Sequence, residues 1–246
     1  AISLERHRLY GGGPHGWPVR ASGAGILTMA GFEKSGYYRR QSFWSARPMA
    51  HLSTIRTAAA AAGSEDVQDI WNYLDGESIE VRCYTNQPSA ELFLNGESFG
   101  CRRKEEQLDS IRWTIPYKPG TMTVKAGNVS HELQTAGLPC RIEAGEFHVP
   151  PQFRHGSSPI HQIEVLLTDH RGIPACRGDL MIHAGVLGGT LVGLENGDIA
   201  DVTDYSLPFR RTRNGRLLVL VRKEEEDGAC TLILSSPDLP ECRVLL

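Results

Sequence analysis

Apolar and polar residues alternate along much of the chain after residue 70. From Ile79 to Tyr84, the apolar residues fall on one face of an extended strand and the polar residues mostly on the other. Asn95-Gly96 lies between two further strand-like runs, and both positions of a tight hairpin turn require positive φ. Short strands with turns about every 8–12 residues predict an immunoglobulin-like β-sandwich.

The same pattern returns after residue 138. Its strand-like runs are Ile163–Leu167, Leu180–His183, Thr190–Leu194, Leu217–Val221 and Ala229–Leu234. The run 217–221 is apolar throughout, which predicts a central strand with both faces covered. The fold class is therefore mainly β, with one immunoglobulin-like β-sandwich over residues 70–137 and a second over residues 138–246.

The first part of the chain has a different pattern. Tyr37, Gln41 and Trp44 recur at helical spacing, and Arg47-Pro48 ends the predicted helix. Residues 1–52 are predicted to form a loop and this short helix. Residues 53–69 contain five consecutive alanines and read as a connecting insertion. We expect a loop there, because short isolated helices are marginal in water.

Composition excludes several classes of function. The 246 residues are 40% apolar and 22% charged, as in an ordinary globular protein. A net charge of −3 argues against a nucleic-acid partner, and no run approaches the ~20 apolar residues of a membrane span. The six cysteines contain no Cys-x-x-Cys pair, so we expect reduced thiols, no structural zinc and a cytoplasmic location. Cys83, Cys101 and Cys230 lie in strand-like runs and are expected to be buried.

Catalytic and ligand-binding motifs are scarce in this sequence. The serines lack a Gly-x-Ser-x-Gly elbow, and Gly11-Gly12-Gly13 lacks the spacing of a phosphate loop. Asn196-Gly197-Asp198 fits a turn or a calcium site, and we favour the turn. Trp71 and Trp113 fall in or beside strands and are expected in the core. No cofactor and no metal site is predicted.

A family resemblance covers the chain from about Tyr10 to its end. The segment from Gly31 to Leu52 resembles the closing helix of the catalytic barrel in glycoside hydrolase family 2, the β-galactosidase-like enzymes. The preceding segment from Tyr10 to Ser22 is similar to the loop after the eighth barrel strand. Other segments resemble the two C-terminal sandwiches of that family and the boundary between them, namely Glu91–Gly100, Thr135–Pro139, Gly193–Asp198 and Arg210–Gly215. One departure is Leu4–Leu9, which is too charged for a buried barrel strand.

The resemblance implies a non-catalytic C-terminal accessory region. The two catalytic glutamates of the family come from earlier barrel strands, so no catalytic residue is assigned to this chain. The implied partner is the catalytic barrel of the parent enzyme or an oligomer mate, with carbohydrate as a further possible ligand. The alternative is a free-standing β-sandwich module that binds a glycan or a protein partner.

Two groups of site residues follow from the resemblance. Tyr10, His15 and Trp17 lie on the segment similar to a barrel-top loop, where barrel enzymes place their substrate, and are candidates for carbohydrate contact. Tyr37, Phe43 and Trp44 are candidates for the surface that packs against the barrel. An accessory region is expected to expose this aromatic surface, whereas a self-sufficient module would cover it.

Overall fold

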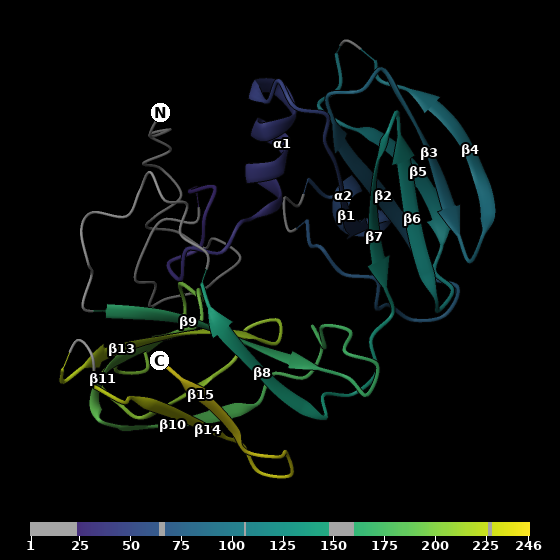
Figure 1. Ribbon diagram of the computed structural model, residues 1–246. Helices are drawn as coiled ribbons and strands as arrows, with labels where there is room; N and C mark the ends of the chain where they lie inside the picture. The colour runs from purple at the N-terminus through teal and green to yellow at the C-terminus, as the bar shows by residue number, and fades with distance from the viewer. Residues whose placement is uncertain (1–23, 64–66, 106, 148–159, 226–227) are drawn as a thin grey trace. The chain divides into compact units, whose positions relative to one another are not determined.

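The computed structural model describes residues 24–63, 67–105, 107–147, 160–225 and 228–246. These residues form two compact units. We call Glu33–Ala136 the N-terminal sandwich. The C-terminal sandwich consists of Gly137–Leu246 together with the described residues up to Phe32. Both units are built mainly from antiparallel strands, which confirms the predicted fold class (Figure 1).

Among its described residues, the N-terminal sandwich has two antiparallel sheets. One sheet has the order β1-β2-β5, from strands Ala50–Arg56, Ser78–Thr85 and Ile111–Pro116. The other has the order β4-β3-β6-β7, from strands Glu97–Arg103, Ser89–Leu94, Thr121–Ala126 and Val129–Gln134. The predicted hairpin is confirmed, because Asn95 and Gly96 join β3 to β4 with φ of 52° and 83°.

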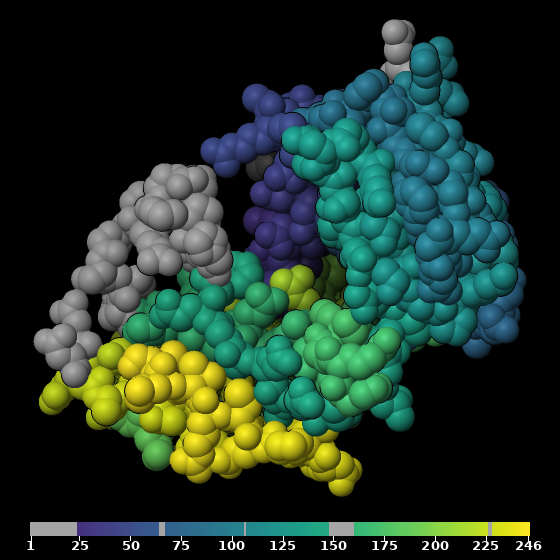
Figure 2. Space-filling view, turned by 45° about the vertical axis from the view of Figure 1, so that its right-hand side comes forward, coloured from purple at the N-terminus to yellow at the C-terminus, as the bar shows by residue number. Residues whose placement is uncertain are grey.

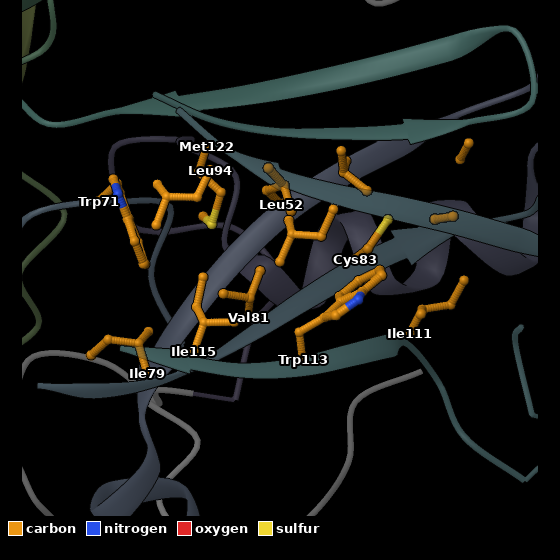
Figure 3. Close-up of a cluster of buried hydrophobic side chains, with 14 of the residues drawn as sticks. Leu52, Trp71, Ile79, Val81, Cys83, Leu94, Ile111, Trp113, Ile115 and Met122 are labelled. Carbon is orange, nitrogen blue, oxygen red and sulfur yellow. The ribbon is translucent and has the colours of Figure 1, made fainter. Parts of the chain in front are cut away.

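The core of this unit lies between the two sheets, as alternation predicted. Figure 3 shows aliphatic side chains of both sheets packed around Trp71 and Trp113. Trp71 is fully buried, and its indole N–H donates to the carbonyl of Lys118 at 3.1 Å. Trp113 is buried as well and donates to the carbonyl of Gly100 at 3.2 Å. Each buried indole therefore has its polar atom satisfied, which a core tryptophan requires.

The loop expected from Ser53 onward is wrong, because the chain there forms β1 and then the short helix α2 (Thr57–Ala61). β1 pairs with β2 along its whole length, although Ser53 and Thr54 make it look polar. Both side chains are fully buried. The Ser53 hydroxyl donates to Asp69 Oδ1 at 2.5 Å, and the Thr54 hydroxyl donates to the carbonyl of Ile70 at 2.7 Å. These bonds offset the cost of burying polar groups.

The C-terminal sandwich also has two antiparallel sheets among its described residues. One has the order β11-β13-β9-β8, from strands Gly189–Glu195, Arg216–Lys223, Ile160–Thr168 and Arg141–Glu146. The other has the order β12-β10-β14-β15, from strands Phe209–Arg211, Met181–Leu187, Thr231–Ser235 and Cys242–Leu245. β13 lies between β11 and β9, which confirms that the apolar run 217–221 is central.

The six cysteines are free, in agreement with the expected thiols. Cys83 and Cys230 are buried, but Cys101 is exposed, so the prediction for Cys101 is wrong. Cys101 lies on β4, which is an edge strand whose residues are mostly exposed. Neither helix among the described residues has the length and apolar character needed to cross a membrane.

Candidate functional site

The helix α1 (Ser35–Trp44) confirms the helix that the sequence predicted to end at Trp44. One face is fastened to its own sandwich. The Tyr38 ring stacks on His51 of β1, with 3.4 Å between centroids and 6° between planes. Arg39 Nε lies 2.8 Å from Asp109 Oδ2. Ser42 is buried, and its hydroxyl donates to the carbonyl of Arg39 at 2.7 Å.

The end of α1 is fixed as firmly as its inner face. Asn86 Nδ2 donates to the carbonyls of Ser45 and Arg47 at 3.0 and 2.7 Å. Asn86 Oδ1 accepts the backbone N–H of Met49 at 3.0 Å. Thr85 donates its hydroxyl to the Met49 carbonyl at 2.6 Å. Four hydrogen bonds thus hold the short segment between α1 and β1.

The outer face of α1 presents aromatic rings to solvent. Trp44 is 74% exposed and Phe43 is 56% exposed. Cations lie over both rings, with Arg40 5.9 Å from the Trp44 centroid and Lys104 Nζ 4.8 Å from the Phe43 centroid. Tyr37 is only partly exposed, and its ring meets Tyr38 edge-on at 5.3 Å. Figure 2 shows the surface of α1 in purple beside the teal surface of the same unit.

A pocket of about 400 Å³ opens beside the inner face of α1. Its walls come from α1, from residues 48–51 at the start of β1, and from residues 129–131 of β7. β1 and β7 are edge strands of the two different sheets of this sandwich. The pocket therefore lies at the seam between the sheets, where α1 crosses it.

The two histidines that line this pocket, His131 and His51, make different contacts. His131 Nδ1 accepts the backbone N–H of Leu52 at 3.1 Å, which satisfies a free donor of the edge strand β1. Burial and the neighbouring His51 lower the pKa of His131 to about 4. His51 Nε2 lies 2.9 Å from Asp69 Oδ2, but the N–H is not aligned for a good hydrogen bond. The two rings are 4.3 Å apart between centroids.

Ser53, His51 and Asp69 lie beneath the pocket but do not form a catalytic triad. Asp69 lies between Ser53 and His51, with contacts of 2.5 Å to the hydroxyl and 2.9 Å to the imidazole. Nucleophile activation needs the imidazole between the hydroxyl and the carboxylate, so that the imidazole takes the proton. Asp69 instead accepts the Ser53 hydroxyl directly and lies beside His51 without a hydrogen bond to it, and this arrangement supports the fold of β1.

The segment after β11 forms a turn closed by its own side chains. Asn196 Oδ1 accepts the Asp198 N–H at 2.9 Å, and Asn196 Nδ2 donates to Asp201 Oδ2 at 2.7 Å. Asp198 pairs with Arg213 at 2.7 Å, and Asp201 lies 3.3 Å from the buried Arg210. Both carboxylates therefore face arginines, which agrees with the favoured turn. The described part of the chain contains no cluster of three or more His, Cys, Asp or Glu side chains suited to a metal ion.

Asp169 is a fully buried carboxylate whose role is structural. It accepts the backbone N–H groups of Gly137, Arg171 and Ile173 at 2.8, 2.8 and 3.0 Å. Burial opposes its ionisation, but these three bonds and the Arg171 guanidinium hold its pKa well below the ordinary range. The carboxylate thereby closes the turn at residues 169–172.

The two predicted groups of site residues have different outcomes in the structure. Tyr10, His15 and Trp17 lie outside the described residues. Phe43 and Trp44 are both exposed at the end of α1, whereas Tyr37 is partly covered. The pocket at the seam was not anticipated, since His51 and His131 are distant in sequence and only the packing of β1 and β7 brings them together.

Two family models match the chain. One is described as glycoside hydrolase family 2 C-terminal domain 5 and matches residues 151–244. The other is a domain of unknown function, DUF4982, and matches residues 76–131. The β-galactosidase BoGH2A of Bacteroides ovatus is 29% identical over 92% of this chain. These matches support a C-terminal region of glycoside hydrolase family 2. This confirms the resemblance seen in the sequence.

Solved structures of bacterial glycosidases have the same fold. A β-glycosidase from Bacteroides vulgatus superposes with a TM-score of 0.78 at 28% identity, over 94% of this chain and 28% of its own. A family 2 member from Bacteroides cellulosilyticus has a TM-score of 0.81 at 23% identity, over 92% of this chain and 32% of its own. The chain spans 25% of the length of BoGH2A, so it corresponds to one part of these larger enzymes.

Proposed function

We propose that this chain is the non-catalytic accessory region of a β-galactosidase-like glycoside hydrolase and supports the catalytic barrel. The observation that carries the proposal is the exposed aromatic pair Phe43 and Trp44 on a helix whose other face is fastened. Aromatic side chains exposed together are typical of protein interfaces. The catalytic barrel is the proposed partner because the related enzymes are about four times as long as this chain.

The surroundings of the aromatic pair support docking of a preformed surface. Asn86 holds the segment that follows Trp44, so little conformational entropy remains to be lost at this end of the helix. We assign Tyr37 to the edge of the surface, because its ring already packs against Tyr38. An oligomer mate is the second partner that this surface would accept. On the resemblance alone, we also propose that Tyr10, His15 and Trp17 contact carbohydrate at the rim of the barrel.

The carboxylates support the assignment of catalysis to another part of the enzyme. Glycoside hydrolysis uses two carboxyl groups roughly 5–10 Å apart across the scissile bond. Asp109 and Asp201 each pair with arginine, and Asp169 is used by backbone N–H groups. Glu91 is taken by the Ser98 hydroxyl at 2.6 Å. These four carboxylates have structural roles, in keeping with the proposal that both catalytic groups lie outside this chain.

The test requires the segment encoded upstream of this chain in the same reading frame. That segment is produced alone, with the wild-type chain, and with the double variant Phe43→Ser, Trp44→Ser. We expect a stable complex and nitrophenyl glycoside hydrolysis with the wild-type chain. With the double variant, we expect the complex to dissociate. The matched control is Leu74→Ser, which removes another highly exposed apolar side chain of the same unit.

Two results would contradict the proposal. The first is hydrolysis of nitrophenyl glycosides by the purified chain alone. The second is a complex that withstands the double variant while circular dichroism confirms that the variant is folded. A wild-type chain that forms no complex with the upstream segment would instead support the alternative of a free-standing module. The cytoplasmic location expected from the cysteines stays a prediction, which fractionation of the source cells would test.

A further inference from the structure

The pocket beside α1 has the size of a small-ligand site. Its volume of about 400 Å³ lies in the lower part of the range for pockets that bind small molecules, roughly 300–1,000 Å³. Its walls are well held, because Tyr38 stacks on His51 and Asn86 fixes the segment before β1. The pocket is open to solvent on one side, and its volume would accommodate one six-membered ring with its substituents.

The hydrogen bond to β1 decides which ring nitrogen of His131 carries the proton. Since Nδ1 accepts the N–H of Leu52, the proton of the neutral ring is on Nε2. The ring is therefore neutral with a fixed tautomer, and Nε2–H is its donor. Burial keeps it neutral at physiological pH, in agreement with its pKa of about 4.

The chemistry of the walls selects for a neutral ligand. Among the described residues that line the pocket, none is Asp, Glu, Lys or Arg. An ionised ligand would lose hydration there without gaining a charged partner, which is costly. Gln41 and Ser130 can each donate and accept a hydrogen bond, as a hydroxyl group does. Met49 and Val129 supply apolar surface for the C–H groups of a ring.

We propose that this pocket binds a neutral, polyhydroxylated ring of the size of one pyranose. Gln41 and Ser130 would bond its hydroxyl groups, and His131 would donate one hydrogen bond from Nε2. The site lies at the sandwich seam and uses residues of α1, β1 and β7. This proposal is independent of the accessory role, because it concerns the inner side of α1 and not the exposed aromatic pair.

The experiment is a titration of the full ¹⁵N-labelled chain, observed by NMR. The probes are D-galactose, D-glucose and D-glucuronate, each up to tens of millimolar at pH 7. We expect saturable shifts with at least one neutral sugar, centred on the Gln41 side-chain amide and the backbone of residues 129–131. We expect D-glucuronate, whose carboxylate finds no partner, to bind at least about tenfold more weakly than the best neutral sugar.

Variants give the second readout. Gln41→Ala and Ser130→Ala should each weaken binding by about 3- to 10-fold, the effect of one lost hydrogen bond. Gln107→Ala is the matched control, because Gln107 is exposed in the same unit and does not line the pocket. Ser130→Trp should fill the pocket and abolish the shifts, with unfolding midpoints confirming that the fold is kept.

Three results would overturn the proposal. One is the absence of saturable shifts with every neutral sugar. Another is equal or tighter binding of D-glucuronate, which would mean that the pocket does not select neutral ligands. The third is binding that is unchanged in Gln41→Ala and Ser130→Trp, which would place the ligand elsewhere on the chain.

Discussion

Asp169 offers a sharp test of how the C-terminal sandwich is held together. Its Oδ1 accepts the backbone N–H groups of Arg171 and Ile173, and its Oδ2 accepts that of Gly137. Asp169→Ala removes both acceptor oxygens and with them all three hydrogen bonds. An N–H group left unpaired costs about 1–3 kcal/mol, and solvent can reach part of these groups. Taking the low end for each bond, we expect a loss of about 3 kcal/mol in the free energy of unfolding.

Asp169→Asn separates the two carboxylate oxygens. An asparagine keeps an acceptor at Oδ1, so the bonds to Arg171 and Ile173 survive. Its amide donor then faces the N–H of Gly137 and the guanidinium of Arg171, which are donors as well. We expect a loss of about 1–2 kcal/mol, between wild type and alanine.

The assay is urea unfolding followed by circular dichroism. Hydrogen–deuterium exchange with mass spectrometry then identifies which of the two units has been destabilised. We expect faster exchange in peptides of the C-terminal sandwich, whereas peptides around Trp71 and Trp113 should keep their protection. The control is Asp238→Asn, because Asp238 is an exposed aspartate of the same unit, and its positive φ of 66° suits asparagine.

The contribution of Asp169 to stability should depend on pH, in the direction set by its lowered pKa. The pKa of Asp169 is lowered in the folded state, so its stabilising contribution is complete above the unfolded pKa of about 3.9. That contribution falls as the pH drops further towards the folded pKa. A difference between wild type and Asp169→Ala of less than about 0.5 kcal/mol at pH 7 would refute the reasoning, since ordinary surface substitutions have effects of that size.

Three further predictions concern the N-terminal sandwich. His131 has a lowered pKa, so its contribution to stability is complete above pH 6.5 and declines as the pH falls to about 4. Over this pH range the free energy of unfolding should fall by about 3 kcal/mol at most, and by about 1–2 kcal/mol after allowing for the partial exposure of His131. His131→Gln should remove this part of the pH dependence of stability. Trp113→Ala should cost about 3–5 kcal/mol in urea unfolding because it empties the core between the sheets. A loss below 1 kcal/mol would mean that the core collapses around the gap. Cys101 should react with a thiol reagent in the native state, whereas Cys83, whose pKa burial raises to about 12, should react only on unfolding. Native labelling of Cys83, located by mass spectrometry, would contradict its burial.

Local patterns predicted most of the strands because alternation and turn chemistry agree in them. The run from Ile79 to Tyr84 and the Asn95-Gly96 turn are examples, and both have the expected structure. β1 escaped prediction because Ser53 and Thr54 are buried polar residues. The partners that satisfy them, Asp69 and Ile70, can be identified only once the chain has folded back.

The features of the candidate site depended even more on tertiary structure. The sequence indicated an aromatic surface on α1 through the family resemblance, and Phe43 and Trp44 are indeed exposed. It gave no sign that Tyr37 would be partly covered by Tyr38. The pocket needs β1 and β7 as edge strands of two sheets, which no local pattern encodes. Cys101 was misjudged because a strand-like run does not reveal that its strand is at an edge.

The way α1 is tied down has a consequence for how such proteins recombine. Tyr38, Arg39 and the residues after Trp44 all bond to the strands or loops of the N-terminal sandwich. A gene rearrangement with its breakpoint between α1 and β1 would leave His51 uncovered and Asn86 without the carbonyls it binds. The smallest segment that recombination can exchange intact is therefore Glu33–Ala136, which includes the helix. Viable breakpoints between related enzymes are expected before α1.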